Sequence, residues 1–180
     1  MRRGAVRGAP LRRLVASLPG GQVSVVYGSQ DGYGSGRPTA RITHITRGSE
    51  GVPDAGHDGL LGGPQAVGDV PGDGCADITV ADGASRLLLN GGRSGLTGIG
   101  SQAITVQQIG LPSTYDEAPN SFGQPRLLNL NGDNYTDLIT EPMHDASDRK
   151  VTVTLHGIRD GFDITRVAVP HGVPTDAAHS

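Results

Sequence analysis

Short apolar and β-branched runs alternate with glycine-rich turns along most of the chain. Three of these runs share one pattern, in which the run ends in Gly, three residues follow, and a second Gly precedes a large apolar or aromatic residue. They cover residues 23–28, 86–91 and 151–157, and lead to Tyr33, Leu96 and Phe162. Each pattern predicts a strand that enters a tight hairpin, because glycine adopts backbone angles that other residues avoid. Further strands are expected at 40–45, 102–107 and 162–169.

A second pattern consists of an acidic turn that occurs twice. Residues 69–77 and 129–137 each carry oxygen-bearing side chains at turn positions 1, 5 and 9, with an apolar run at 78–80 or 138–140 directly after them. Such spacing lets several oxygens converge on a hard cation such as calcium. Asp, Asn and Gly also cluster in plain hairpin turns for backbone reasons, so both interpretations stay open for a single copy.

A third element, Leu61-Gly62 or Phe122-Gly123, precedes each acidic turn and completes a unit of about 60 residues with four short strands. We therefore predict an all-β fold, an incomplete β-propeller of about two and a half to three four-stranded antiparallel blades. The expected parts are a partly disordered basic segment (1–21), a partial first blade (22–50), a second blade (51–115), a third blade (116–171) and a disordered tail (172–180).

Composition agrees with many short strands, since 29 Gly and 12 Pro leave little room for long helices. Five arginines fall within the first thirteen residues, which leaves 10 basic against 18 acidic residues and a charge of −8 over 14–180. An acidic body fits cation binding and argues against nucleic acid, which requires a clustered basic face. We expect the basic start to be solvated.

The chain shows no targeting or spanning segment and no catalytic motif. Its longest apolar run near the start, 14–16, is shorter than the roughly 7–15 residues of a signal peptide core, and no stretch reaches the roughly 20 residues of a membrane span. Cys75 is the only cysteine, which excludes an intrachain disulfide. The six histidines are dispersed and no nucleophile-elbow sequence is present, so we expect no enzymatic activity.

The order of these elements resembles the FG-GAP repeats of the integrin α-subunit propeller and of many secreted bacterial proteins. Phe122-Gly123 stands as the "FG" and Gly8-Ala9-Pro10 as the "GAP", and between them lie the calcium loop, D-x-D-x-D-G-x-x-D in the family, and the tyrosine-glycine hairpin. The resemblance covers the chain from about residue 6. The chain departs from the family's loop pattern at three residues, which are Pro71 and Asn131 at loop position 3 and Asn129 at position 1 of the second copy.

The resemblance implies two weak, structural calcium sites. The ligands in the first loop would be the side chains of Asp69, Asp73 and Asp77 and the Cys75 carbonyl, and in the second those of Asn129, Asn131, Asp133 and Asp137 and the Tyr135 carbonyl. With few charged ligands, affinity is expected near the ~10⁻⁴–10⁻³ M of extracellular modules.

The resemblance also implies an extracellular binding or adhesion module that acts on a protein or glycan. The alternative is the non-catalytic propeller portion of a secreted hydrolase. Propellers close with about 4–8 blades, and this chain supplies fewer. It is therefore expected to be a piece of a longer propeller, to self-associate through exposed blade faces, or to be completed by a partner.

Overall fold

The computed structural model describes residues 13–18, 21–27, 42–53, 61–83, 85–111, 122–141 and 151–168. Within these ranges the chain is all-β and contains no helix, as the sequence predicts. The strands are β1 (Arg13–Leu18), β2 (Gln22–Tyr27), β3 (Ile42–Thr46), β4 (Leu61–Gly68), β5 (Asp77–Asp82), β6 (Ser85–Asn90), β7 (Thr97–Thr105), β8 (Arg126–Leu128), β9 (Asp137–Thr140), β10 (Val153–Ile158) and β11 (Gly161–Ala168).

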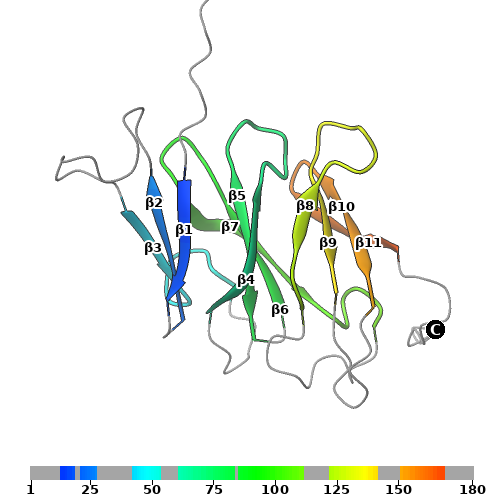
Figure 1. The fold of residues 1–180 in the computed structure, drawn as a ribbon, viewed down its shortest axis with the longest axis horizontal. Helices are drawn as coiled ribbons and strands as arrows, with labels where there is room; N and C mark the ends of the chain where they lie inside the picture. The colour runs from blue at the N-terminus through cyan, green and yellow to red at the C-terminus, as the bar shows by residue number, and fades with distance from the viewer. Residues whose placement is uncertain are drawn as a thin grey trace, which may run out of the picture.

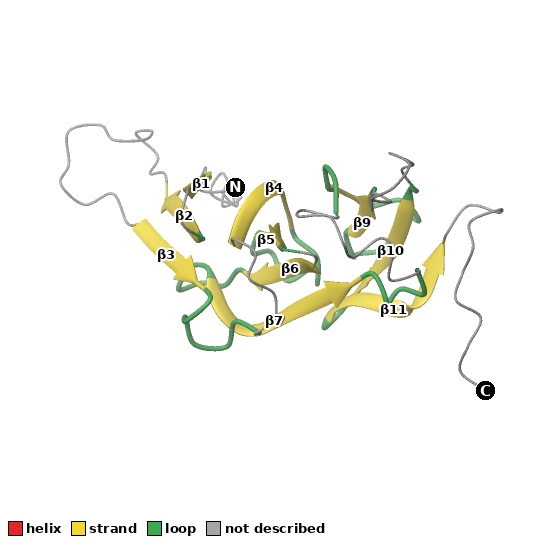
Figure 2. Ribbon diagram, turned by 90° about the horizontal axis from the view of Figure 1, so that it is seen from below, coloured by secondary structure: helices red, strands yellow, loops and turns green. Residues whose placement is uncertain are grey.

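The strands form three antiparallel meanders that follow one another along the chain. The first sheet has the order β1-β2-β3, the second β4-β5-β6-β7 and the third β8-β9-β10-β11. Figures 1 and 2 show the sheets side by side in chain order, with β4 in contact with β8 on one side and with β1 and β2 on the other. The two complete units of the sequence pattern correspond to the second and third sheets.

The first sheet includes a strand that the sequence patterns do not predict, because β1 lies inside the basic segment 1–21. It pairs with β2 from Arg13 opposite Tyr27 to Leu18 opposite Gln22. The connection is short, and Gly21 with its φ of 80° suits the turn. The apolar run 14–16 is therefore strand sequence. The expected disordered tail, 172–180, lies outside the described residues.

Two apolar cores lie between the sheets, one on each face of the second sheet. Leu87 and Leu89 of β6 join a core with Val23, Val25 and Ile45 of the first sheet. Leu88, between them in sequence, joins a different core on the opposite face, with residues of the third sheet that include Leu138, Val153, Leu155 and Phe162. Since neighbouring residues of a strand point to opposite faces, the second sheet is packed on both sides.

A buried arginine fastens the Phe122-Gly123 dipeptide to the second sheet. The Arg86 guanidinium donates hydrogen bonds to the carbonyls of Phe122 at 2.9 Å and Gly123 at 2.7 Å, and lies 5.7 Å from the centre of the Phe122 ring. Burial lowers the pKa of Arg86 to about 9, which still leaves the side chain charged at neutral pH. The cation therefore finds partial compensation in carbonyl dipoles and the aromatic face.

Two further polar contacts join neighbouring sheets. The Gln102 side chain of β7 accepts from Phe162 N at 2.8 Å and donates to Phe162 O at 2.9 Å, so it pairs with the start of β11 as another strand would. Between the first two sheets, Arg47 forms a salt bridge with the buried Asp82. Polar side chains thus fix the alignment of sheets whose apolar contacts alone are not directional.

Arg86→Ala is expected to lower the free energy of unfolding by about 2–4 kcal/mol, because it leaves one buried and one partly buried carbonyl without these donors and opens a cavity beside Phe122. Denaturant unfolding followed by circular dichroism measures this. Arg126→Ala, which removes an exposed arginine from β8, is the matched control and should change stability by less than about 0.5 kcal/mol. Equal losses in the two variants would contradict the proposed role of Arg86.

Candidate functional site

The two acidic turns lie at the same end of neighbouring sheets and are built alike. Loop 1 (69–76) connects β4 to β5, and loop 2 (129–136) connects β8 to β9. In loop 1 the carboxylate of Asp77 accepts from Val70 N at 2.8 Å and from Gly91 N at 2.7 Å. In loop 2 the equivalent distances from Asp137 are 2.7 Å to Leu130 N and 2.9 Å to Gly157 N. The aspartate at position 9 therefore has the same two backbone partners in both copies.

The aspartate at position 9 connects the acidic loop to the glycine hairpin, which are separate patterns in the sequence. Gly91 and Gly157 are the first glycines of the predicted hairpins, and each donates its amide to the position-9 carboxylate. A Cβ on Gly91 would lie 2.1 Å from Ala76 O, and one on Gly157 would lie 2.4 Å from Thr136 O. Glycine is required here because the hairpin backbone approaches the acidic loop so closely.

Inside loop 1 the remaining carboxylates face backbone amides. Asp69 accepts from Asp73 N at 3.0 Å and from Gly74 N at 2.8 Å, and Asp73 accepts from Cys75 N at 2.7 Å. Cys75 is half-buried. The loop thus presents carboxylate oxygens from Asp69, Asp73 and Asp77 around one short turn, with Pro71 adding no side-chain oxygen at position 3.

Loop 2 carries its own compensation for the negative charge. Asp133 accepts from Tyr135 N at 2.7 Å, as Asp73 does from Cys75. The side-chain amide of Asn131 donates to Asp133 Oδ2 at 2.7 Å, and that of Asn129 donates to the Asp133 carbonyl. The Asn131 amide therefore occupies a carboxylate oxygen of Asp133 that a cation would otherwise use.

The two loops also contact each other. Thr136 N donates to Val70 O at 3.2 Å, and a Cβ added to Gly72 would lie 2.4 Å from Asn134 O. The close approach and the φ of 69° at Gly72 both require glycine at this turn. Successive repeats are thus joined at the loop end as well as through the cores.

The position-9 aspartates have pKa values shifted in opposite directions. Burial raises the pKa of Asp77 to about 6, and the nearby carboxylates of Asp73 and Asp69 add to this, against the lowering effect of the Gly91 and Val70 amides. Burial also raises the pKa of Asp137, but its two amide donors and His156, whose Nδ1 lies 3.2 Å from Oδ1, lower it overall. Loop 1 has the less compensated charge.

The donor chemistry of loop 1 fits calcium, because all of its candidate ligands are oxygens. In the part of the chain that the structure describes, no three His, Cys, Asp or Glu side chains converge as a metal-holding group. The carboxylates of loop 1 are instead held by the backbone amides named above. Loop 2 fits less well, because asparagine amides already compensate Asp133.

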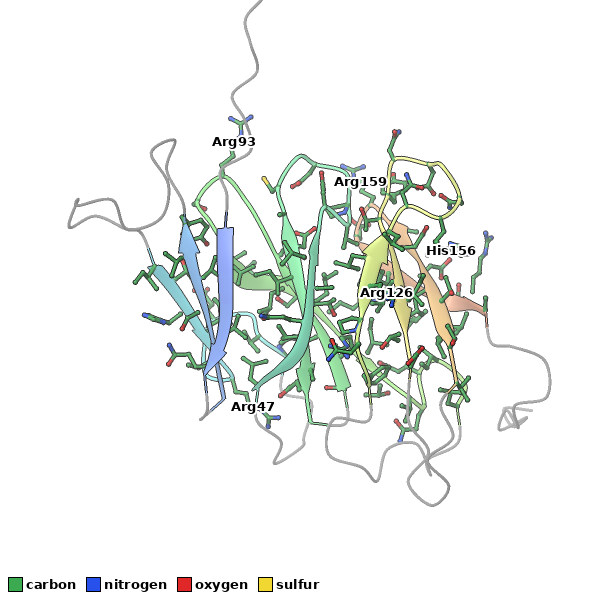
Figure 3. The ribbon with its side chains drawn as sticks, in the orientation of Figure 1. Arg47, Arg93, Arg126, His156 and Arg159 are labelled. Carbon is green, nitrogen blue, oxygen red and sulfur yellow. The ribbon has the colours of Figure 1, made fainter. Side chains whose placement is uncertain are left out.

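A groove of about 740 Å³ opens beside loop 1, between the second and third sheets. Asp73, Asn90, Tyr135 and Arg159 are among its lining residues, and Figure 3 shows Arg159 at the loop end, between loops 1 and 2. Sequence reasoning missed this groove because its walls come from separate repeats. The available signal was that each hairpin and each acidic loop end at the same edge of a predicted sheet.

Sequence reasoning also missed a Ser–His contact on the outward face of the first sheet. Ser24 Oγ lies 2.9 Å from His44 Nδ1, and Gln22 hydrogen-bonds to both side chains. The contact follows from strand register, since Ser24 of β2 is directly opposite His44 of β3. His44 and His156 belong to the described residues, and the other histidines, His57, His144, His171 and His179, lie outside them.

No protein-family model matches the chain, and no curated protein or solved structure matches it. None of the described residues forms a helix that is both long and apolar enough to cross a membrane. The family resemblance therefore depends on the repeat pattern itself.

The opposite pKa directions predict opposite pH dependence for two matched variants in calcium-free buffer. The pKa of Asp77 is raised, so its stabilising contribution is complete only well below pH 3.8 and is lost as pH rises through about 6. Asp77→Asn should therefore be less destabilising at pH 7.5 than at pH 4, by about 2.4 kcal/mol for a pKa change from 3.8 to about 6.

Asp137→Asn should show the reverse order. The pKa of Asp137 is lowered, so its contribution is present at neutral pH and is lost as pH falls through the folded-state pKa. The variant should be more destabilising at pH 7.5 than in acid. Urea unfolding of both variants and the parent at each pH tests the pair, and parallel pH profiles would contradict the assignment.

Proposed function

We propose that the chain is a non-catalytic binding or adhesion module of the FG-GAP type, built from propeller-like blades and stabilised by calcium. The observation that carries the proposal is the recurrence of the same hydrogen bonds around Asp77 and Asp137, which supports treating two segments sixty residues apart as copies of one loop design. A hairpin turn unrelated to the repeat would not be expected to bring the amide of the hairpin glycine to the same carboxylate.

The stacking of the sheets supports propeller-type blades. Each sheet is a meander of neighbouring strands, and the second sheet has apolar cores on both faces, as a blade between two others would. Among the described residues the sheets form an open row. Each sheet therefore corresponds to a propeller-type blade in this proposal. A closed ring would require an assembly that contains more sheets.

Calcium would bind loop 1 through Asp69, Asp73, Asp77 and the Cys75 carbonyl, and loop 2 more weakly. Its role would be to neutralise the carboxylates of loop 1, since repulsion from Asp73 and Asp69 adds to the effect of burial in raising the pKa of Asp77. Because Asp77 also holds the hairpin through Gly91, neutralisation at the loop would stabilise the whole end of the sheet.

Thermal unfolding with calcium against chelator tests this proposal. For a site with a dissociation constant near 1 mM, about 10 mM calcium adds about 1.4 kcal/mol of stability, which raises Tm by about 3–6 °C for a chain of this size. The same concentration of magnesium should give a smaller shift, because magnesium requires strict octahedral geometry.

Variants separate specific binding from a general effect of salt. Asp73→Ala should remove most of the calcium-induced shift, and Asp133→Ala only a minor part. Glu50→Ala, an exposed acidic residue outside both loops, should keep the full shift. A parent protein whose Tm is the same in calcium and in chelator would exclude calcium stabilisation and leave only the repeat architecture.

The outward faces of the first and third sheets are part of the proposal, because each is the kind of face that a further sheet covers in a stacked repeat. Ile42 of the first sheet and Leu128 and Ile158 of the third are 49%, 48% and 41% exposed. The strand register places all three on these outward faces. We infer that copies of the chain associate through them.

Sedimentation velocity at increasing protein concentration tests this association. The parent should show a rising average mass, and the double variant Leu128→Glu, Ile158→Glu should shift toward the monomer. Val67→Glu, which places the same charge at an exposed apolar residue of the second sheet, is the control and should still associate. A parent that stays monomeric throughout would rule out self-association.

A further inference from the structure

The groove between the second and third sheets has the dimensions of a ligand site. Its volume of about 740 Å³ falls within the range of about 300–1,000 Å³ that is typical of small-molecule pockets. Its walls come from loop 1, from the β6–β7 hairpin, from Tyr135 of loop 2 and from the β10–β11 hairpin. Figure 3 shows the Arg159 side chain at this end of the sheets.

The inner part of the groove is fixed by the fold. Asp77 is 1% exposed, and its two oxygens accept from Val70 N and Gly91 N, which fixes its position at the base of the groove. Gly91 and Gly72 also line the groove, and a Cβ on either would meet backbone atoms within 2.5 Å. A larger residue at either position would force the loop backbones apart, so this wall of the groove depends on glycine at both positions.

The outer part carries exposed groups of both charges. Arg159 and Asp160 of the β10–β11 hairpin face the groove together with Asp73 of loop 1, and all three residues are exposed. With calcium on Asp73, Arg159 and Asp160 remain as the charged groups, so a simple anion would meet the Asp160 carboxylate and a simple cation would meet the Arg159 guanidinium. A neutral ligand with many hydroxyl groups avoids both conflicts, because hydroxyls donate to carboxylates and accept from arginine.

The remaining lining groups fit the same class of ligand. Asn90 and Thr97 supply an amide and a hydroxyl, which can each donate and accept. Tyr135 is half-buried and offers an aromatic surface with a polar tip. A pyranose ring combines hydroxyls at its rim with an apolar C–H face, and so matches both kinds of group.

We propose that this groove binds a neutral oligosaccharide through Arg159, Asp160, Asn90 and Tyr135. The inference builds on the proposed function as a binding module and names the class of ligand. Calcium at loop 1 would occupy Asp73, and the other four residues would then form the site without it.

Isothermal titration of the whole chain with cellotriose, maltotriose and triacetylchitotriose tests the proposal, with trigalacturonic acid and trilysine as charged comparison ligands. At least one neutral trisaccharide should bind, and more tightly than either charged ligand. Arg159→Ala with Asp160→Asn should weaken binding about tenfold or more, since each removes a charged hydrogen-bond partner. Tyr135→Ala should weaken it independently.

Arg93→Ala is the matched control, because Arg93 is an exposed arginine of the β6–β7 hairpin that does not line the groove. It should leave saccharide binding unchanged. Failure of all three neutral trisaccharides at millimolar concentration, tighter binding of a charged ligand, or full binding by the Arg159, Asp160 variant would each overturn the proposal.

The calcium-induced Tm shift of the same Arg159, Asp160 variant separates this inference from the proposed function. A variant that loses saccharide binding and keeps the calcium shift confirms that the two sites are distinct. Saccharide binding in a parent protein without any calcium shift would support the groove and reject the calcium loops.

Discussion

One carboxylate in each repeat holds two separate parts of the backbone together. Asp77 and Asp137 each accept an amide from the start of the acidic loop and another from the hairpin between the following strands. A buried carboxylate without partners is very unfavourable, and these amides supply the compensation. Replacing the aspartate would therefore release a loop and a hairpin at once, which explains why both patterns recur together in the sequence.

The interior of the protein consists of two apolar cores between three stacked sheets. The chain has only 3% aromatic residues, and its three sheets share two cores made mainly of Val, Leu and Ile. Residues such as Leu87 and Leu88 serve different cores although they are adjacent in sequence. A sheet that is buried on both faces needs no large side chains to cover it, because its neighbours cover it.

The strand content and the repeated units could be predicted from the sequence, because turn glycines and β-branched runs are local signals. The strand β1 was missed because its arginine-flanked apolar run 14–16 is short, and it is stabilised by pairing with β2 and not by its own composition. The predicted calcium ligands of each loop do lie around one turn. Whether they hold a cation depends on amide orientations, such as that of Asn131 toward Asp133, which spacing cannot reveal.

The groove and the polar contacts between sheets could not be predicted from the sequence, because they join residues that are far apart in the chain. Arg86 meets Phe122 and Gly123, and Gln102 meets Phe162, across 36 and 60 residues respectively. No periodic pattern marks such pairs, because each occurs once. Non-repeating neighbours also contribute to the opposite pKa directions of the two aspartates: Asp77 has the carboxylates of Asp73 and Asp69 nearby, and Asp137 has His156 where the other copy has Asn90.

The hydrogen bond from Thr136 N to Val70 O gives the row of repeats a mechanical property. Val70 is held by Asp77 and Thr136 directly precedes Asp137, so the backbone of one loop is tied to the anchor of the next. When either loop becomes rigid, its neighbour has less conformational entropy left to lose. Ordering one of these two loops therefore lowers the entropy cost of ordering the other, as in the nearest-neighbour coupling of stacked repeats.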